Sequence, residues 1–245
     1  MNDPNAAGPL ALVGGDELRP GNEPQDRLLI EAAGGGPAFV LATAAARQRP
    51  ELAVANARRW FGALGLDVEE LPATRRSHVT SAEVAERARS GRFFYLVGGD
   101  PGLVPRTLAG TPVWEAVANA WAAGAALAGS SAGAMALAEW TLVRERRPGD
   151  HRRRYVPALG LVPGLAVLPH FESFGHRWVT SASERDDVVL LGLDERTAAV
   201  WLDGAWTALG AGRVTTIAGG SPRLVEAGSR IPGLPRPVVP APPSA

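Results

Sequence analysis

Ser131 stands in a sequence that could support nucleophilic chemistry. The apolar run Ala125–Ala128 meets a Gly-Ser-Ser-Ala-Gly turn, and the helix-forming run Ala132–Glu139 follows at once. This order predicts a strand, a sharp turn and a helix, with the serine on the turn. The small residues beside it would let the flanking chains pass closely. A helix N-cap is the alternative interpretation, because serine is a favoured cap residue.

His170 is the candidate base. A serine hydroxyl is a poor nucleophile until a base within hydrogen-bond reach takes its proton, and a third group usually orients that base. His170 follows the apolar segment 164–169 and is therefore expected at the end of a strand. A core or capping histidine is the alternative. Of the other histidines, His176 favours contact with substrate or solvent, whereas His78 and His151 lie in a polar turn and an Arg-rich loop.

The acid that would orient His170 is sought between Ser131 and His170. Glu139 lies eight residues after the serine on an expected helix, roughly 12 Å along its axis, which is too far to orient the base easily. Glu145 and Asp150 lie beyond that helix, in a loop that could fold back over the site. We expect Glu145 to be the acid, with Asp150 as the alternative.

Two absences narrow the chemistry further. The chain of 245 residues has no cysteine, which excludes a thiol nucleophile and a thiolate zinc site. All 25 of its basic residues are arginine, which excludes a Ser-Lys dyad, a P-loop lysine and Schiff-base chemistry. No pair of histidines has the spacing of a helical zinc motif. We therefore expect neither a metal nor a cofactor.

Composition and charge indicate the class of protein. An apolar content of 46% suits one large α/β domain, and a net charge of zero indicates neither a nucleic acid nor a membrane as partner. The N-terminus does not resemble a signal peptide, and the absence of cysteine fits the cytoplasm. We expect a cytoplasmic protein, and a homodimer is an assembly that the sequence leaves open.

Strands and helices alternate along the chain, which predicts a three-layer α/β fold with a mostly parallel sheet and helices on both faces. A two-residue Asp203-Gly204 turn predicts a β-hairpin near the C-terminus. We expect disorder in residues 1–9, one domain in residues 10–231, and a disordered tail in residues 232–245, which hold six prolines. Strands are expected at 10–13, 37–43, 66–71, 92–97 and 213–217, and helices at 50–65, 80–90 and 112–123.

Glycine-rich turns follow three of these strands, at 14–15, 98–99 and 129–133. The carboxyl ends of parallel strands form the functional edge of such a sheet, so the three turns could meet in one crevice. An oxyanion formed there would need backbone donors, and we expect the amides of Gly99 and Ala132 to supply them.

The segment 144–154 carries six arginines. A solvated surface loop is the simpler interpretation, because charge runs usually face water. The functional hypothesis is a basic rim that attracts acidic peptides.

The turn around Ser131 also fits the nucleophile elbow of α/β-hydrolases. Only 39 residues separate Ser131 from His170, which leaves too little chain for the further strand–helix units of that fold. Three segments together resemble the cyanophycinase and peptidase E family of serine peptidases instead. They are Gly129–Ala134, Val97–Asp100 and Pro169–Phe171, supported by 158–164 and by Gly192-Leu-Asp-Glu-Arg-Thr-Ala198, which is closer to the cyanophycinase branch.

The resemblance implies a sheet related to class I glutamine amidotransferases, with Ser131 as nucleophile and His170 as base. It implies hydrolysis of amide bonds at aspartyl residues, with Asp100, Pro101 and Arg177 at substrate-binding positions. Cyanophycinases have glutamine where this chain has Pro101, and of their arginine-rich pattern after the histidine only Arg177 roughly survives. We therefore expect a peptidase of short aspartyl peptides. A hydrolase of β-Asp-Arg links and a non-catalytic binding protein are the alternatives.

Overall fold

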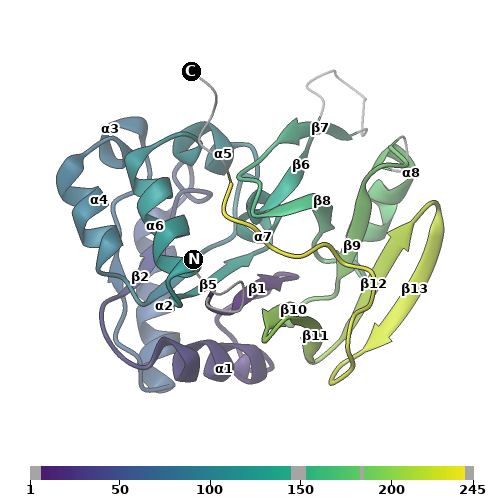
Figure 1. Ribbon diagram of the computed structural model, residues 1–245, viewed down its shortest axis with the longest axis horizontal. Helices are drawn as coiled ribbons and strands as arrows, with labels where there is room; N and C mark the ends of the chain where they lie inside the picture. Colours follow the sequence, from purple (N-terminus) through teal and green to yellow (C-terminus); the bar gives the residue numbers. More distant parts are fainter. Residues whose placement is uncertain (1–6, 145–152, 183–184, 241–245) are drawn as a thin grey trace.

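The computed structural model describes residues 7–144, 153–182 and 185–240, which form two β-sheets with helices around the first (Figure 1). The first sheet has the strand order β11-β10-β1-β5-β4-β2-β3. Its strands β1 to β5 are parallel, and the hairpin β10–β11 adds antiparallel strands at one edge. The strands are β1 (Leu10–Val13), β2 (Ala38–Leu41), β3 (Glu69–Glu70), β4 (Phe93–Leu96), β5 (Ala126–Ser130), β10 (Thr197–Leu202) and β11 (Ala205–Gly210).

Helices cover both faces of this sheet because its strands are apolar on both sides. In β1, Leu10 and Leu12 belong to the core beneath α4 and α6, whereas Ala11 and Val13 belong to the core beneath α1 and α2. The fold class expected from the sequence is therefore confirmed. The helices are α1 (Glu23–Ala33), α2 (Pro50–Ala63), α3 (Arg76–Val79), α4 (Ala82–Arg89), α5 (Leu103–Leu108), α6 (Pro112–Ala122) and α7 (Ala132–Leu137).

A second sheet lies beside the first, in the strand order β13-β12-β9-β8-β6-β7. Its middle strands β6, β8 and β9 are parallel, and the others are antiparallel. Its strands are β6 (Ala138–Arg144), β7 (Arg153–Pro157), β8 (Val162–Leu168), β9 (Val189–Leu193), β12 (Arg213–Ala218) and β13 (Ser221–Glu226). The short helices η1 (Gly175–Trp178) and α8 (Val179–Ala182) connect β8 to β9.

Several local expectations need correction. Helix α7 ends at Leu137 rather than Glu139, and the chain continues directly into β6. The arginine-rich segment 144–154, expected to be a loop, has its ends in β6 and β7. The strand expected at 66–71 shrinks to two residues at the edge of the sheet, where it has one neighbour only. The C-terminal hairpin forms as predicted, with positive φ at both Asp203 and Gly204.

Residues near both ends of the described chain, within the segments 1–9 and 232–245 for which we expect disorder, form long-range hydrogen bonds. Trp121 exchanges two hydrogen bonds with Gly8, one through its ring N–H and one through its carbonyl, each of 2.8 Å. Trp206 Nε1 donates to the carbonyl of Pro235 over 2.9 Å, and the amide of Val238 donates to Leu161. Buried tryptophans thus fix residues 8 and 235 through long-range contacts, which composition does not reveal.

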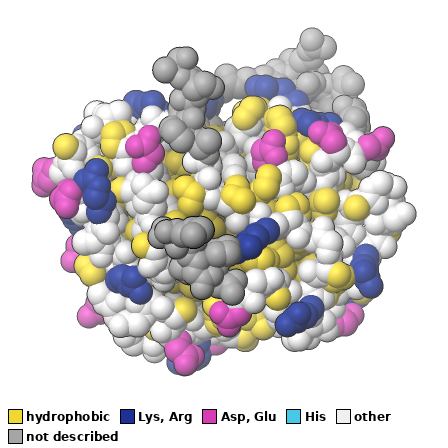
Figure 2. All heavy atoms as spheres, in the orientation of Figure 1, with side chains coloured by type: hydrophobic (Ala, Val, Ile, Leu, Met, Phe, Trp, Pro, Cys, Tyr) yellow, Lys and Arg dark blue, Asp and Glu magenta, His cyan; other side chains and the backbone are white. Residues whose placement is uncertain are grey.

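Acidic and basic side chains are interspersed on the face of the molecule shown in Figure 2, in keeping with the zero net charge. Within the described parts of the chain, no helix combines the length and the apolar character that crossing a bilayer requires.

The strand registers bring together the ends of three strands in the first sheet and of two strands in the second. Val13 of β1 pairs with Ser130 of β5, and Leu96 of β4 pairs with Gly129. The turns after these three strands are therefore neighbours, as the sequence predicts. In the second sheet β8 and β9 are parallel neighbours, so their carboxyl ends also lie together.

Candidate active site

Ser131 occupies a strained turn between β5 and α7. Its backbone has φ 49° and ψ −112°, a conformation that non-glycine residues rarely adopt. Glycines on both sides allow the chain to pass through this turn. A Cβ at Gly129 would lie 2.5 Å from the carbonyl carbon of Gly133, and a Cβ at Gly133 would lie 2.3 Å from the oxygen of Leu96. The turn therefore holds the serine side chain at the end of the strand.

His170, two residues beyond β8, faces this serine. Its Nε2 lies 3.1 Å from Ser131 Oγ, and its own backbone is strained, with φ 50°. Its amide donates to the carbonyl of Gly14 over 2.7 Å, which ties the second sheet to the first. Phe174 stacks on the imidazole, with ring centroids 4.9 Å apart. A Cβ at Gly15 would lie 2.3 Å from His170 Cε1, so the imidazole requires glycine at that position.

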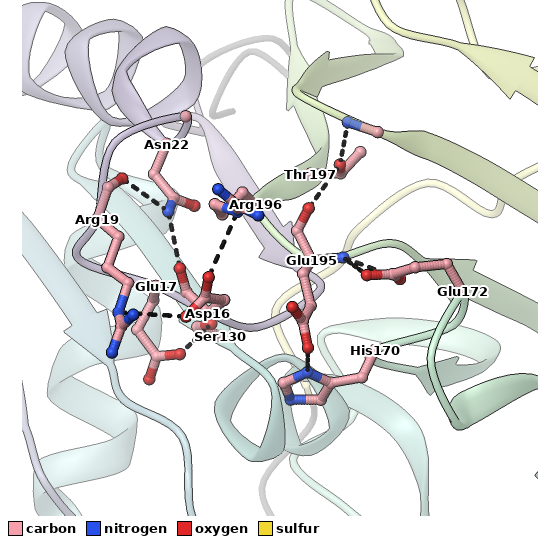
Figure 3. A network of polar contacts seen from close by, with 12 residues as sticks. Asp16, Glu17, Arg19, Asn22, Ser130, His170, Glu172, Glu195, Arg196 and Thr197 are labelled. Atoms are coloured by element: carbon pink, nitrogen blue, oxygen red, sulfur yellow. Dashed lines mark hydrogen bonds and ion pairs between the residues drawn. The ribbon is translucent and has the colours of Figure 1, made fainter.

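Glu195 supplies the third group. Its Oε1 lies 2.7 Å from His170 Nδ1 (Figure 3). A carboxylate only accepts hydrogen bonds, so Nδ1 carries the proton and Nε2 is left as the acceptor for the serine hydroxyl. Glu172 accepts the backbone N–H of Glu195 with both carboxylate oxygens, each at 3.1 Å. Burial raises the pKa of Glu172, and the charges of Asp194 and Glu195 add to this effect.

Glu195 is not among the acids predicted from the sequence, because those lie between the serine and the histidine. Glu145 and Asp150, the acids predicted from the sequence, lie outside the described residues. A usable signal was present, since Glu195 stands two residues after an apolar strand in the Gly-Leu-Asp-Glu motif. His170 likewise stands two residues after β8, and β8 and β9 are parallel neighbours. Acidic residues that follow the histidine in the chain are therefore equally good candidates for the acid.

The two amides expected to bind an oxyanion lie on turns beside Ser131. A Cβ at Gly98 would lie 3.3 Å from Ser131 Cβ, so the Gly98-Gly99 turn touches the nucleophile. The N–H of Gly98 already has an acceptor, because it donates to Glu17 Oε1 over 2.8 Å. Gly99 has φ 144°, and a Cβ there would lie 2.3 Å from the oxygen of Ala44. Ala132 is the first residue of α7, a position whose N–H has no acceptor within the helix.

The model of peptidase family S51 matches residues 10–208. The chain belongs to this family. Family membership makes it a serine-type peptidase, as the resemblance of its sequence implies. A solved peptidase from an acI-B1 actinobacterium is 29% identical, with a TM-score of 0.82 over 94% of this chain and 98% of that chain. A candidate peptidase E from Listeria monocytogenes EGD-e shares the fold at 19% identity, with a TM-score of 0.55 over 92% and 100% of the two chains. No curated protein matches the chain.

Backbone strain in this S51 peptidase gathers around the same place. Among the described non-glycine residues, six have positive φ, and Asp203 of the hairpin turn is one of them. The other five lie on the turns and loops that surround the Ser131–His170 pair: Asp16, Leu18, Ser131, His170 and Arg196. Each such residue costs about 1–3 kcal/mol and persists only where the surroundings enforce it, which is typical of functional sites.

A basic cavity adjoins the histidine of the S51 peptidase. It has a volume of about 460 Å³, and its lining residues are Arg144, Arg153, Phe174, Arg177 and Trp178. The guanidinium of Arg153 stacks over the Trp178 ring at 3.9 Å. Burial lowers the pKa of Arg153, and the neighbouring charge of Arg144 lowers it further. Phe174, 39% exposed, stacks on His170 and lines the cavity, and therefore connects the two.

The remaining predicted residues, Asp100 and Pro101, follow the Gly98-Gly99 turn. Asp100 Oδ1 accepts the N–H of Gly102 over 2.8 Å, and its backbone N–H donates to the carbonyl of Ala44. These bonds fix the course of the chain between the glycine turn and α5. Arg177 lies on η1 and belongs to the basic cavity, apart from Asp100 in the sequence and in its contacts.

Proposed function

We propose that this S51 peptidase hydrolyses amide bonds at aspartyl residues of short peptides, with Ser131, His170 and Glu195 as a catalytic triad. One observation carries the proposal: the hydrogen-bonded series from Ser131 Oγ through the two ring nitrogens of His170 to Glu195 Oε1, with distances of 3.1 and 2.7 Å. This is the order of contacts that nucleophilic serine catalysis requires.

The chemistry follows from these contacts. His170 Nε2 takes the hydroxyl proton as Ser131 Oγ attacks the carbonyl carbon of the scissile bond. Glu195 keeps the proton on Nδ1 and stabilises the imidazolium that forms. The tetrahedral oxyanion accepts hydrogen bonds from the amides of Gly99 and Ala132. His170 then gives its proton to the leaving amine, and a water molecule activated by the same imidazole hydrolyses the acyl-serine.

The basic cavity supports an acidic substrate. Three arginines line a cavity together with Phe174, whose ring also stacks on His170. Arginine binds carboxylates through paired N–H donors, so an aspartyl side chain is a suitable ligand for this cavity. Because of these arginines, we expect aspartyl peptides to be better substrates than neutral peptides.

The first test is covalent labelling. A fluorophosphonate probe should attach to the wild-type protein at Ser131 and should not attach to Ser131→Ala. Ser130→Ala is a matched control, because Ser130 precedes the nucleophile and its hydroxyl bonds to Glu17 rather than to His170. It should still be labelled. Absence of labelling in the wild type between pH 6 and 9 would favour the non-catalytic alternative.

The second test separates the substrates. Asp-X, Glu-X, Asn-X and β-Asp-Arg dipeptides should be compared by kcat/KM with the same enzyme preparation. We expect Asp-X to exceed its neutral isostere Asn-X by at least tenfold. A preference for β-Asp-Arg would instead favour the cyanophycinase-like alternative, and equal rates for Asp-X and Asn-X would contradict a role for the basic cavity.

A further inference from the structure

Glu17, in the loop after β1, connects the two turns of the candidate active site. Its Oε1 accepts the N–H of Gly98 over 2.8 Å, and its Oε2 accepts the hydroxyl of Ser130 over 3.0 Å. Gly98 precedes one expected oxyanion donor, Gly99, and Ser130 precedes the nucleophile. One carboxylate therefore joins the turn after β4 to the turn after β5.

The loop that carries Glu17 is held rigidly. Glu17 stands between Asp16 and Leu18, which have φ of 49° and 61°. Asn22 Nδ2 donates to the carbonyl of Asp16 over 3.0 Å, and Arg196 forms an ion pair with the Asp16 carboxylate (Figure 3). Strain of this kind persists only where contacts over-determine the conformation. The contacts fix the direction in which Glu17 reaches.

The geometry explains what the Glu17 contact does to the amides. Because the N–H of Gly98 is bonded to Glu17, the next amide, that of Gly99, is the donor of this turn that remains for an oxyanion. Ser130 is fully buried, so its hydroxyl is held at the Glu17 carboxylate and away from solvent.

We propose that Glu17 is a positioning residue that sets the distance between the Gly99 amide and Ser131, and so stabilises the transition state without contacting substrate. The proposal rests on the proposed serine peptidase activity. Both carboxylate oxygens of Glu17 already accept hydrogen bonds, which argues against a role in proton transfer. The expected consequence is an effect on kcat rather than on substrate binding.

The central variants are Glu17→Ala, which removes both hydrogen bonds, and Glu17→Gln, whose amide oxygen can still accept the N–H of Gly98. Glu31→Gln is the control, because it also removes one negative charge, at an exposed position of α1 outside both turns. We expect Glu17→Ala to lower kcat about 10- to 100-fold, less than the loss of a whole oxyanion donor. Glu17→Gln should recover most of this loss, and Glu31→Gln should remain within about threefold of the wild type.

Two binding measurements distinguish a misplaced oxyanion donor from a general loss of structure in Glu17→Ala. A peptide aldehyde forms a hemiacetal with the serine and places its oxygen where the oxyanion develops, so its Ki should rise in Glu17→Ala in parallel with the fall in kcat/KM. The Kd of an Asp-X substrate, measured in a Ser131→Ala background, should change by less than about threefold. Equal weakening of the aldehyde and the substrate would overturn the proposal, and so would a Glu17→Ala variant that behaves like Glu31→Gln.

Hydrogen exchange at the Gly98 amide tests the contact with Glu17 independently of peptidase activity. In Glu17→Ala, exchange at the Gly98 amide, read from a peptide spanning residues 97–103, should accelerate more than tenfold, and Glu31→Gln should leave it unchanged. If the wild-type protein cleaves no peptide, the proposed function fails, while this exchange still reports on the Glu17 link. Unchanged exchange would overturn the link. Should Glu17→Ala not fold, Glu17→Asp replaces it, because its shorter side chain cannot reach both Gly98 and Ser130. The same exchange and aldehyde criteria then apply, and wild-type behaviour of this variant would overturn the proposal.

Discussion

The active site joins two sides of the molecule that are built differently. The nucleophile side, residues 7–137, presents Ser131 and the expected oxyanion amides through backbone turns packed against one another. The base side, residues 138–144, 153–182 and 185–196, presents side chains. The imidazole of His170 is 20% exposed, the carboxylate of Glu195 is 31% exposed, and Phe174 reaches 39%.

The two sides therefore differ in the substitutions that they can accept. On the nucleophile side, added Cβ atoms at Gly129, Gly133 or Gly99 would lie within 2.5 Å of backbone atoms, so side-chain changes there must move the chain. On the base side, the groups that face the serine are the side chains of His170, Glu195 and Phe174, so substitutions of these residues change charge and hydrogen bonding directly. We infer that the nucleophile side fixes the chemistry and that the base side adjusts the base and the substrate.

The largest expected effect is that of Glu195→Gln on the base side. The side-chain amide can donate an N–H to His170 Nδ1, which would move the ring proton to Nε2 and remove the acceptor for the serine hydroxyl. We expect kcat to fall about 10³- to 10⁴-fold, by analogy with loss of the triad acid in other serine peptidases. KM should change by no more than a few-fold. Steady-state kinetics on the preferred Asp-X substrate measure both.

Glu172→Gln is the matched control for this variant. Its amide oxygen can still accept the backbone N–H of Glu195, so kcat should stay within about tenfold of the wild type. If Glu195→Gln is also within tenfold, another acid orients His170. Glu145→Gln and Asp150→Asn would then be the variants to compare.

A smaller and more selective effect is expected from Arg153→Gln. Arg153 lines the basic cavity, and its loss should raise KM for Asp-X about tenfold, the size of one charge-assisted hydrogen bond. KM for Asn-X should not change. Arg154→Gln is the matched control, because the next residue of a strand points to the opposite face and this one is exposed. An equal rise for both variants, or for both substrates, would indicate a general surface potential rather than a substrate site.

The sequence predicts most of the nucleophile side. Its strands are short apolar runs that end in glycine turns, and this pattern alone indicates a parallel sheet and its functional edge. Ser131 could be singled out because the nucleophile turn imposes small residues on its neighbours. The base side is harder to predict from the sequence, because the ends of β6 and β7 lie in an arginine-rich segment that resembles a surface loop.

Glu17 and Glu195 could not be predicted with equal ease. Glu17 bonds to Gly98 and Ser130 across 81 and 113 residues of chain, and a single acid after a glycine turn is indistinguishable from an exposed one. Glu195 was within reach, because it follows an apolar strand, but only the pairing of β8 with β9 brings it to His170. Contacts of this kind depend on strand order, which periodicity does not encode.

The smallest effect on rate is expected from Asp26→Asn, on the nucleophile side. Burial raises the pKa of Asp26 from 3.8 to about 7, although the hydrogen bond from Trp60 Nε1 opposes this and the charges of Glu23 and Glu17 add to it. Between pH 4 and 7 the unfolded chain loses this proton while the folded protein keeps it. The free energy of unfolding should therefore fall as pH rises through this window, by a few kcal/mol in total.

The amide introduced by Asp26→Asn keeps an oxygen that can accept from Trp60 but cannot ionise, so the variant should lose this pH dependence. Urea denaturation at pH 5 and pH 8 measures it: relative to the wild type, the variant should gain stability between the two, and kcat should change less than about threefold at either pH. An unchanged pH slope would show that Asp26 is not the titrating group. A large loss of kcat would show that polar side chains behind the sheet also control the chemistry, and would remove the contrast between a nucleophile side governed by backbone and a base side governed by side chains.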